Sequence, residues 1–186
     1  ITDKIELKDT PLSRLTGYKT TVIYYEQKTT GRNDYITNTA NIGTLDPNKV
    51  AYIKIRDFII LCSDALNVSV ETNDSHTDLM GEGTAKILPK TVKPLIGDHF
   101  LMSTMKKNNL YRITNVNKTS IEDDSAYEIS YQLVEESSEE KLNEIEKLVV
   151  EKYYFVYAHV GTSFRSLMRE DEYKTLANLE DFYMTL

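Results

Sequence analysis

Short runs that alternate apolar and polar residues fill the middle of the chain, between Val50 and Val134. Such alternation indicates strands with one face against a core, because successive side chains of a strand point to opposite faces. The pattern predicts strands at 19–26, 52–61, 68–70, 85–87, 100–102, 110–116 and 127–134. Short polar segments separate most of them, which favours a small antiparallel barrel or sandwich over alternating βαβ units.

The segment KPLIGDHFLMSTMKKNNLYRITNV, residues 93–116, shows how two of these strands connect. Pro94 cannot donate a hydrogen bond to a strand ladder, and Gly97-Asp98 is a favoured turn pair. The sequence therefore predicts that a strand begins at His99, that the chain reverses at 106–109 and that a second strand returns from Leu110. With the strand at 127–134, this hairpin makes a three-stranded meander.

The two ends of the chain follow other patterns. After Gln27 apolar residues become sparse, and the stretch 28–49 reads as an arm that becomes ordered against a partner. In the C-terminal part, apolar residues recur at helical spacing over 142–153 and again over 173–183. A β-prone aromatic patch at 153–157 lies between these two predicted helices.

These patterns divide the chain into three regions: an N-terminal strand and extended arm at 1–49, an antiparallel β core at 50–135 and a helical C-terminal extension at 136–186. A chain of 186 residues is long enough for one substantial core with extensions that pack on something else. The predicted fold class is α+β, mainly antiparallel β. It is a small β barrel or sandwich with an N-terminal arm and C-terminal helices.

Charge and hydropathy exclude several classes of function. The formal net charge is -7, and no Lys/Arg cluster is longer than Lys106-Lys107, whereas a nucleic-acid groove needs a concentrated basic face. No apolar stretch approaches the roughly 18 residues that a membrane span requires. Cys62 is the only cysteine and follows the apolar run 59–61, so we expect a buried structural thiol.

Polar clusters in the middle of the chain give only weak signals of metal or phosphate binding. Asp74, His76 and Asp78 bring two carboxylates and an imidazole close together, which are groups that ligate metals. A structural zinc site normally adds cysteines or further histidines, so a solvated loop is the favoured interpretation. Gly81-Glu-Gly83-Thr lacks the third glycine of a dinucleotide turn and the Gly-Lys-Ser/Thr ending, and we expect a plain turn there.

Asp98, His99 and Ser103 carry the chemical groups of a hydrolytic triad. Adjacent strand residues face opposite sides of a sheet, however, so Asp98 and His99 do not converge easily, and the sequence has no nucleophile elbow. Glu122-Asp-Asp124 lies in an expected turn, where weak surface binding of Ca²⁺ is the most it provides. We therefore expect no catalytic, cofactor or metal site, and a chain that is not an enzyme.

The aromatic composition points to contacts between proteins. The chain has 13 tyrosines and no tryptophan, and tyrosine offers a broad amphipathic contact surface at low entropic cost. Tyrosine is also ordinary strand material. The run Tyr153, Tyr154, Phe155 and Tyr157 places aromatic rings on both faces of one segment, which indicates burial on both faces and an intersubunit contact.

Three stretches carry a family resemblance: GEGTAKILPKTVKPLIGDHFLM, LYRITNV and AYEISYQLV. With their Gly-Asp turn and tyrosine-rich strands, residues 50–134 resemble structural proteins of the tailed-bacteriophage particle, which build its neck, tail and baseplate. The resemblance implies assembly into symmetric rings or sleeves, the absence of a cofactor, and arms or terminal helices that dock on neighbouring subunits.

The leading hypothesis is therefore a structural subunit of a phage particle, located in the virion and assembled in the host cytoplasm. Its expected partners are other copies of itself and other virion proteins, with no membrane, no sequence-specific nucleic acid and no small-molecule substrate. The expected contact residues are Tyr24, Tyr25, Tyr153, Tyr154, Phe155, Tyr157, Leu176, Leu179 and Phe182.

Two alternatives remain open. A β module that binds a small ligand or carbohydrate would stack its tyrosines on sugar rings. A hydrolase would use His76 or His99 with Asp78 or Asp98.

Overall fold

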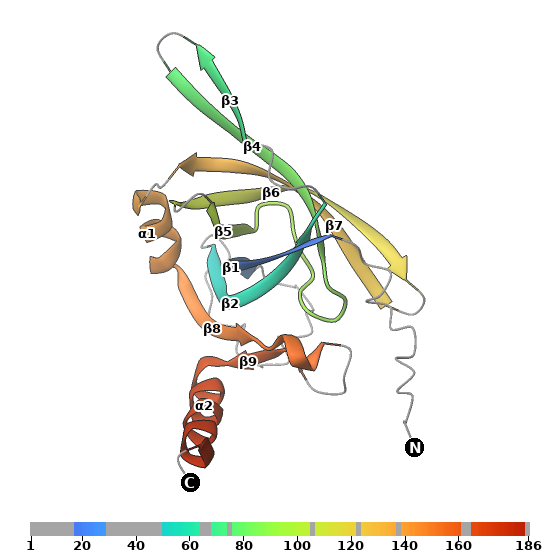
Figure 1. Cartoon of the computed structure of the whole chain (residues 1–186), viewed down its shortest axis with the longest axis vertical. Coiled ribbons are helices and arrows are strands. Elements are labelled where there is room, and N and C mark those ends of the chain that lie inside the picture. The colour runs from blue at the N-terminus through green and yellow to red at the C-terminus, as the bar shows by residue number, and fades with distance from the viewer. Residues whose placement is uncertain are drawn as a thin grey trace.

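The computed structural model describes residues 17–28, 50–63, 68–73, 76–104, 107–121, 124–136, 139–160 and 165–184 (Figure 1). The strands are β1 (Tyr18–Lys28), β2 (Ala51–Cys62), β3 (Val68–Asn73), β4 (His76–Ile87), β5 (His99–Thr104), β6 (Lys107–Ile121), β7 (Asp124–Glu136), β8 (Val149–Phe155) and β9 (Leu167–Arg169). Two α-helices, α1 (Glu139–Lys147) and α2 (Glu170–Met184), and a 3₁₀ turn at Tyr157–His159 belong to the C-terminal part. The predicted arm at 28–49 lies, after Lys28, outside the described residues.

Six strands close into a barrel in the order β1-β2-β4-β7-β6-β5, with β5 pairing back onto β1. All neighbours in this ring are antiparallel. Outside the ring, β3 pairs with β4, β8 runs parallel to β2, and β9 pairs with β8. The predicted class, mainly antiparallel β with a small barrel and C-terminal helices, is confirmed.

The predicted hairpin is confirmed as β5 and β6, and β7 completes the meander. Thr104 pairs with Lys107, so the chain reverses earlier than the predicted 106–109. The register continues to the pair His99 and Arg112, at the start of β5. The strand start predicted at His99 therefore matches the structure.

The plain turn predicted at Gly81-Glu-Gly83-Thr is wrong, because these residues belong to β4. A Cβ atom on Gly83 would lie 2.5 Å from the hydroxyl oxygen of Tyr131, and one on Gly81 would lie 3.4 Å from the ring of Tyr111. Glycine in a strand interior often marks such a close approach. The two glycines thus make room for tyrosine rings rather than for a change of chain direction.

Aromatic rings fill the barrel. Phe100 stacks on Tyr111 with ring centroids 5.4 Å apart, and Tyr131 meets both of them edge-on. On the other side of the core, Tyr24 lies 5.1 Å from Phe58. All five rings are buried. Cys62 is buried as predicted, with its sulfur 3.9 Å from the hydroxyl of Tyr131. These tilted and offset contacts are the arrangements that aromatic pairs favour.

The loop between β4 and β5, residues 88–98, ends on a buried carboxylate. The Asp98 side chain is fully buried and accepts hydrogen bonds from the Tyr24 hydroxyl at 2.8 Å and from the backbone N–H groups of Gln27 at 2.8 Å and Leu95 at 2.9 Å. The backbone carbonyl of Asp98 also accepts a hydrogen bond from β6, donated by the Ile113 N–H at 2.8 Å. One side chain thus joins the loop to β1.

The first predicted C-terminal helix is shorter than its periodicity indicated. It ends at Lys147, and β8 begins at Val149 and pairs in parallel with β2. Val149 and Val150 are β-branched and fit a strand, and the backbone of β2 offers a free edge for them. The predicted strand patch at 153–157 is therefore the end of a longer strand. The final helix predicted over 173–183 is confirmed as part of α2.

We predict that Asp98→Ala lowers the free energy of unfolding by about 3 to 5 kcal/mol, because it leaves buried donors without an acceptor. Tyr24→Phe removes one donor only and should cost about 1 to 2 kcal/mol. In the Asp98→Ala background, Tyr24→Phe should cost almost nothing, since the interaction is already lost. Urea denaturation of the four chains measures this, with the exposed Asp171→Ala as control. Equal effects of Tyr24→Phe in both backgrounds would contradict the assignment.

Candidate assembly surface

Helix α2 stands at the end of the chain's body and projects away from the barrel (Figure 1). Its first turns are attached by aromatic stacking: the ring of Tyr173 lies parallel to that of Tyr154, with centroids 4.2 Å apart. Arg56 of β2 donates a hydrogen bond to the Tyr154 hydroxyl at 2.9 Å. Local ion pairing adds support, since Lys174 lies 3.1 Å from Glu170 one turn earlier. The base of α2 is therefore fixed to β2 and β8.

Beyond this attachment, α2 exposes an apolar face. Leu176 and Leu179 are three residues apart, so they share one face of the helix, and their exposed fractions are 46% and 48%. The sequence predicted both as contact residues. Phe182 continues the same spacing in α2, but its side chain lies outside the described part of the chain.

Of the predicted contact residues near β8, Tyr157 is exposed and Tyr154 is half-buried. Tyr157 follows β8, is 49% exposed, and lies under the ammonium group of Lys19 at 3.9 Å from the ring centroid. Such a cation–π contact stabilises the exposed ring modestly. Tyr154 is half-buried by Tyr173. The sequence predicted that both faces of this segment are buried. On the face that carries Tyr154, the ring of Tyr173 from the same chain provides that burial.

The other four predicted contact residues are buried inside the subunit: Tyr24, Tyr25, Tyr153 and Phe155. Tyr24 bonds to Asp98, and Phe155 meets the ring of Phe58 edge-on at 5.2 Å. Tyr153 donates to Glu151 at 2.9 Å. Their role at a subunit boundary stays a prediction, and in the isolated chain their rings pack within the barrel and its flank.

Tyr25 and Lys54 both bind Glu146, and these contacts attach α1 to the barrel. The Tyr25 hydroxyl donates to the Glu146 carboxylate at 2.6 Å, and Lys54 forms an ion pair with the same carboxylate. Burial, with the hydrogen bond to Glu146, raises the pKa of Tyr25 above its ordinary value. Burial alone would raise the pKa of Glu146, but the hydrogen bonds from Lys54 and Tyr25 lower it below its ordinary value.

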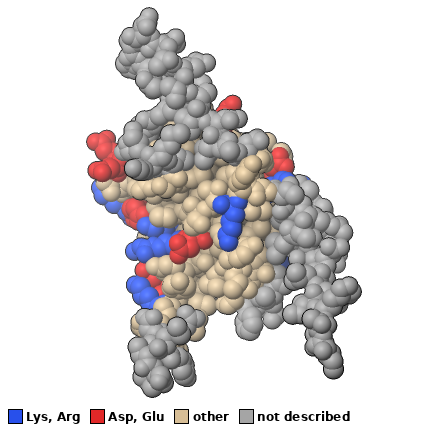
Figure 2. Space-filling view, in the orientation of Figure 1, with Lys and Arg blue, Asp and Glu red and all other residues tan. Residues whose placement is uncertain are grey.

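A second ion pair, between Lys28 and Glu151, ties β8 to the end of β1. Figure 2 shows that residues of both charge signs gather along one edge of the molecule, while much of the remaining visible face carries other residues. Along this visible edge the charges of opposite sign therefore partly offset each other.

Sequence reasoning missed several exposed apolar side chains. Val50, Ile96, Leu148 and Val150 have exposed fractions between 42% and 60%. Each lies beside or within an apolar run, and an apolar run in a sequence signals burial. No local pattern distinguishes these residues from the core.

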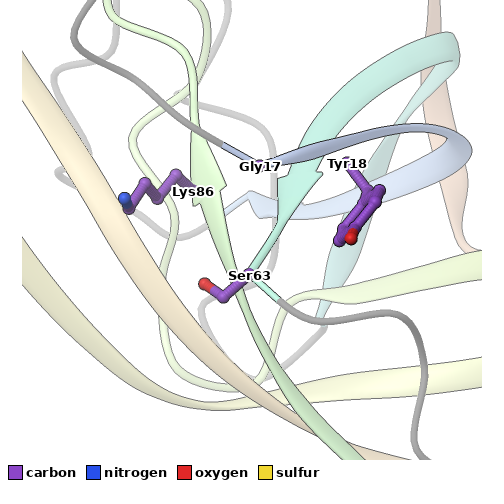
Figure 3. A pocket seen from close by; sticks show the side chains of 4 residues that line it. All are labelled: Gly17, Tyr18, Ser63 and Lys86. Atoms are coloured by element: carbon purple, nitrogen blue, oxygen red, sulfur yellow. The ribbon is translucent and has the colours of Figure 1, made fainter.

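A pocket of about 320 Å³ lies where β1 begins and β2 ends, lined by Gly17, Tyr18, Ser63 and Lys86. Figure 3 shows that the side chains of Tyr18 and Lys86 point in different directions and do not converge on a common point. Ligand sites usually combine an enclosed apolar wall with a few convergent polar groups. This pocket therefore lacks the convergent polar groups that a carbohydrate-binding site would need.

The candidate hydrolytic residues are separated by the sheet. Asp98 bonds to Tyr24 on the inner face, whereas the ring of His99 lies 6.0 Å from that of Tyr52, in the outer layer beneath α1. Burial, with the nearby cations Arg112 and Lys141, lowers the pKa of His99 to about 4. This imidazole is neutral and enclosed at neutral pH.

Among the residues that the structure describes, no group of three or more His, Cys, Asp or Glu side chains forms a metal site. Of the metal candidates, Asp74 lies outside those residues, as do Glu122 and its neighbour at 123. His76 and Asp78 belong to β4, but their side chains are outside the described part. Within the same part of the chain, no helix is long and apolar enough to span a membrane.

Comparison with protein families matches residues 2–169 to a family described as "Putative phage head-tail joining protein". The chain belongs to this family. Searches of curated proteins and of solved structures find no match. A phage head-tail joining protein is a structural subunit of a phage particle, and it is a virion component that contacts other virion proteins. The resemblance of the sequence to tailed-phage structural proteins is confirmed.

We predict that acid destabilises this head-tail joining protein through His99. The folded pKa of about 4 lies below the ordinary 6.5, so the unfolded state binds the proton more tightly, and stability is lost as pH falls from 6.5 to 4. The loss from this residue amounts to about 3 kcal/mol, at about 1.4 kcal/mol for each pH unit.

Denaturation of wild type and His99→Gln at a series of pH values measures this contribution. The variant should lose less stability between neutral pH and pH 4 than the wild type does. Gln132→Ala, at an exposed position of β7 that carries no titratable group, is the control and should keep the wild-type slope. Parallel curves for wild type and His99→Gln would show that His99 is not responsible.

Proposed function

We propose that the chain is a subunit of the neck of the phage particle, where it joins head to tail through protein contacts and catalyses no reaction. Membership of the head-tail joining family across residues 2–169 carries this proposal. The fold supports it, because a closed barrel with an aromatic core provides a rigid body, and α2 stands out from that body with two exposed leucines.

The mode of assembly is also a proposal. Copies associate as a homo-oligomer, and the sheet edges, the arm and the C-terminal elements make the contacts. The described sheet ends at β3 on one side and at the three-residue β9 on the other, so both offer backbone groups to a neighbour. The hairpin of β3 and β4 also projects from the barrel (Figure 1).

In this proposal the chain combines a rigid barrel with flanking segments that contact neighbouring subunits. Residues 50–135, together with β1, supply the rigid barrel, while 136–186 and the arm within 1–49 engage the neighbours. Assembly takes place in the host cytoplasm, without a membrane, a specific nucleic-acid sequence or a small-molecule substrate.

The expected contact residues divide according to their exposure. Tyr157, Leu176 and Leu179 are exposed and meet the neighbour directly, and Phe182 extends the stripe of α2. Tyr154 holds the base of α2 in place through Tyr173. The buried tyrosines and Phe155 act from within the subunit, because they fix the strands that carry these contacts.

We predict that Leu176→Asp/Leu179→Asp leaves the barrel folded but prevents head-tail joining. Both side chains lie on the projecting part of α2, so thermal unfolding should shift little, whereas charged groups at the centre of an apolar contact abolish binding. A phage that lacks this chain should yield separate filled heads and tails in electron micrographs. Wild type supplied in trans should restore joined particles, and the double variant should not.

Val50→Asp is the matched control, because Val50 is 47% exposed at the start of the barrel region, outside the segments proposed to engage the neighbours, and takes the same substitution. It should restore joining as wild type does. Joined particles in the absence of the chain would refute the neck assignment. Normal joining by the double variant would refute the role of α2. Saturable glycan binding by the isolated chain would instead favour the carbohydrate-binding alternative.

A further inference from the structure

His99 is buried against the outer surface of the barrel, in the layer that α1 covers. Its exposed fraction is 8%, and its ring meets that of Tyr52 edge-on, with centroids 6.0 Å apart. The Nδ1 atom of His99 is buried and has no hydrogen-bond partner in the part of the chain that the structure describes. A buried polar nitrogen without a partner costs stability, so its presence calls for a physical explanation.

The surroundings of His99 oppose a positive charge on the imidazole. Burial opposes it first, and two cations add to this: Arg112, the partner of His99 in the β5–β6 register, and Lys141 of α1. From β1 and β2, the imidazole faces Tyr25 and Tyr52. Burial raises the pKa of both tyrosines above its ordinary value, so neither supplies a negative charge at or below neutral pH.

The carboxylates of neighbouring residues are bonded to other groups. Asp98 accepts the hydroxyl of Tyr24 on the inner face, and Glu146 of α1 forms an ion pair with Lys54. Neither carboxylate is bonded to His99 among the residues that the structure describes. A proton on the imidazole would therefore lie among cations without a counter-charge of its own.

Helix α1 is attached to the barrel by few contacts. It has nine residues, and its one buried side chain is that of Ile145, which packs beside Tyr25 and Tyr52. The closed ring of six strands does not include α1, so the helix can leave without breaking a strand pair of that ring. A helix of this length is unstable in water by itself, so its release also unfolds it.

We propose that protonation of His99 releases α1 from the outer face of a barrel that stays closed. Once α1 has left, the imidazole reaches water and holds a proton readily, whereas under the attached helix the proton is opposed by burial and by Arg112 and Lys141. Mild acid therefore favours the released state. The inference concerns the attachment of α1, and it holds whether or not the chain occupies the neck of the particle.

The expected size of the effect follows from the proton affinity of His99 in the two states. The pKa is about 4 under the attached helix and ordinary, 6.5, in the released state. Release therefore becomes more favourable as pH falls from 6.5 to 4. Between pH 7 and pH 5 its equilibrium constant should rise about twentyfold. Against burial, hydrogen bonds keep the pKa values of Glu146 and Glu151 below the ordinary 4.5, so these carboxylates stay charged in this interval.

Hydrogen exchange of the full chain, measured by mass spectrometry and corrected for the intrinsic effect of pH, tests the release. Protection of the α1 amides at 139–147 should fall about twentyfold from pH 7 to pH 5, because exchange follows the released population. Protection of β6 at 110–116, which reports opening of the barrel, should change far less. Constant protection of α1, or a parallel loss in β6, would overturn the inference.

Two variants assign the pH response to a residue. His99→Gln cannot titrate, so its α1 protection should stay nearly constant between pH 7 and pH 5. Glu146→Gln is the matched control: it weakens the attachment at every pH but should keep the twentyfold fall, because Glu146 does not titrate in this interval. A wild-type fall in His99→Gln, or no fall in Glu146→Gln, would show that His99 is not the responsible group.

Nuclear magnetic resonance of the unaltered chain gives a second test that needs no substitution. The His99 ring should stay neutral while α1 is attached, and its protonation should coincide with the loss of the amide signals of attached α1. A ring that titrates near pH 6.5 while those signals persist would overturn the inference, even if His99→Gln fails to fold.

Discussion

The buried carboxylate of Asp98 is the interaction on which the closure of the barrel depends. The seam between β1 and β5 is short, from Ile23 paired with Leu101 to Tyr25 paired with His99. Just beyond it, Asp98 accepts hydrogen bonds from Tyr24 and Gln27 of β1 and from its own loop. A buried charge is costly without such partners, and with them it selects one arrangement of the chain. The hydrogen bonds of Asp98 therefore fix both the shape of the loop and the closure of the barrel.

A second constraint joins the C-terminal region to this barrel. Glu146 binds both Tyr25 and Lys54, and β8 adds a parallel partner to β2. Ile145 of α1 packs on the outer surface beside Tyr25, so the outer face of β1 is covered. Because these contacts fix β8 and β9, the helix that follows them leaves the body in a defined direction. A projecting helix can then act as a docking element rather than as a loose tail.

These features suit a protein that joins two large assemblies. Three of its described polar groups have structural roles: Asp98 closes a loop, Glu146 holds a helix, and the neutral His99 lies beneath α1. The net charge of -7 favours repulsion between copies. Any contact between copies then has to offset this repulsion.

The sequence by itself determined the elements: the hairpin that begins at His99, the final helix and the mainly antiparallel class follow from local periodicity and turn residues. Tertiary structure decided what each face meets. Residues 51–55 are buried on both faces, although the alternation indicated one buried face, because the barrel lies inside them and α1 and β8 outside. The sequence pattern also failed to predict the short first helix, the glycines within β4 and the exposure of Ile96. Periodicity reports that a side chain is suited to burial, but the segment that buries it can lie a hundred residues away, as Glu146 does from Tyr25.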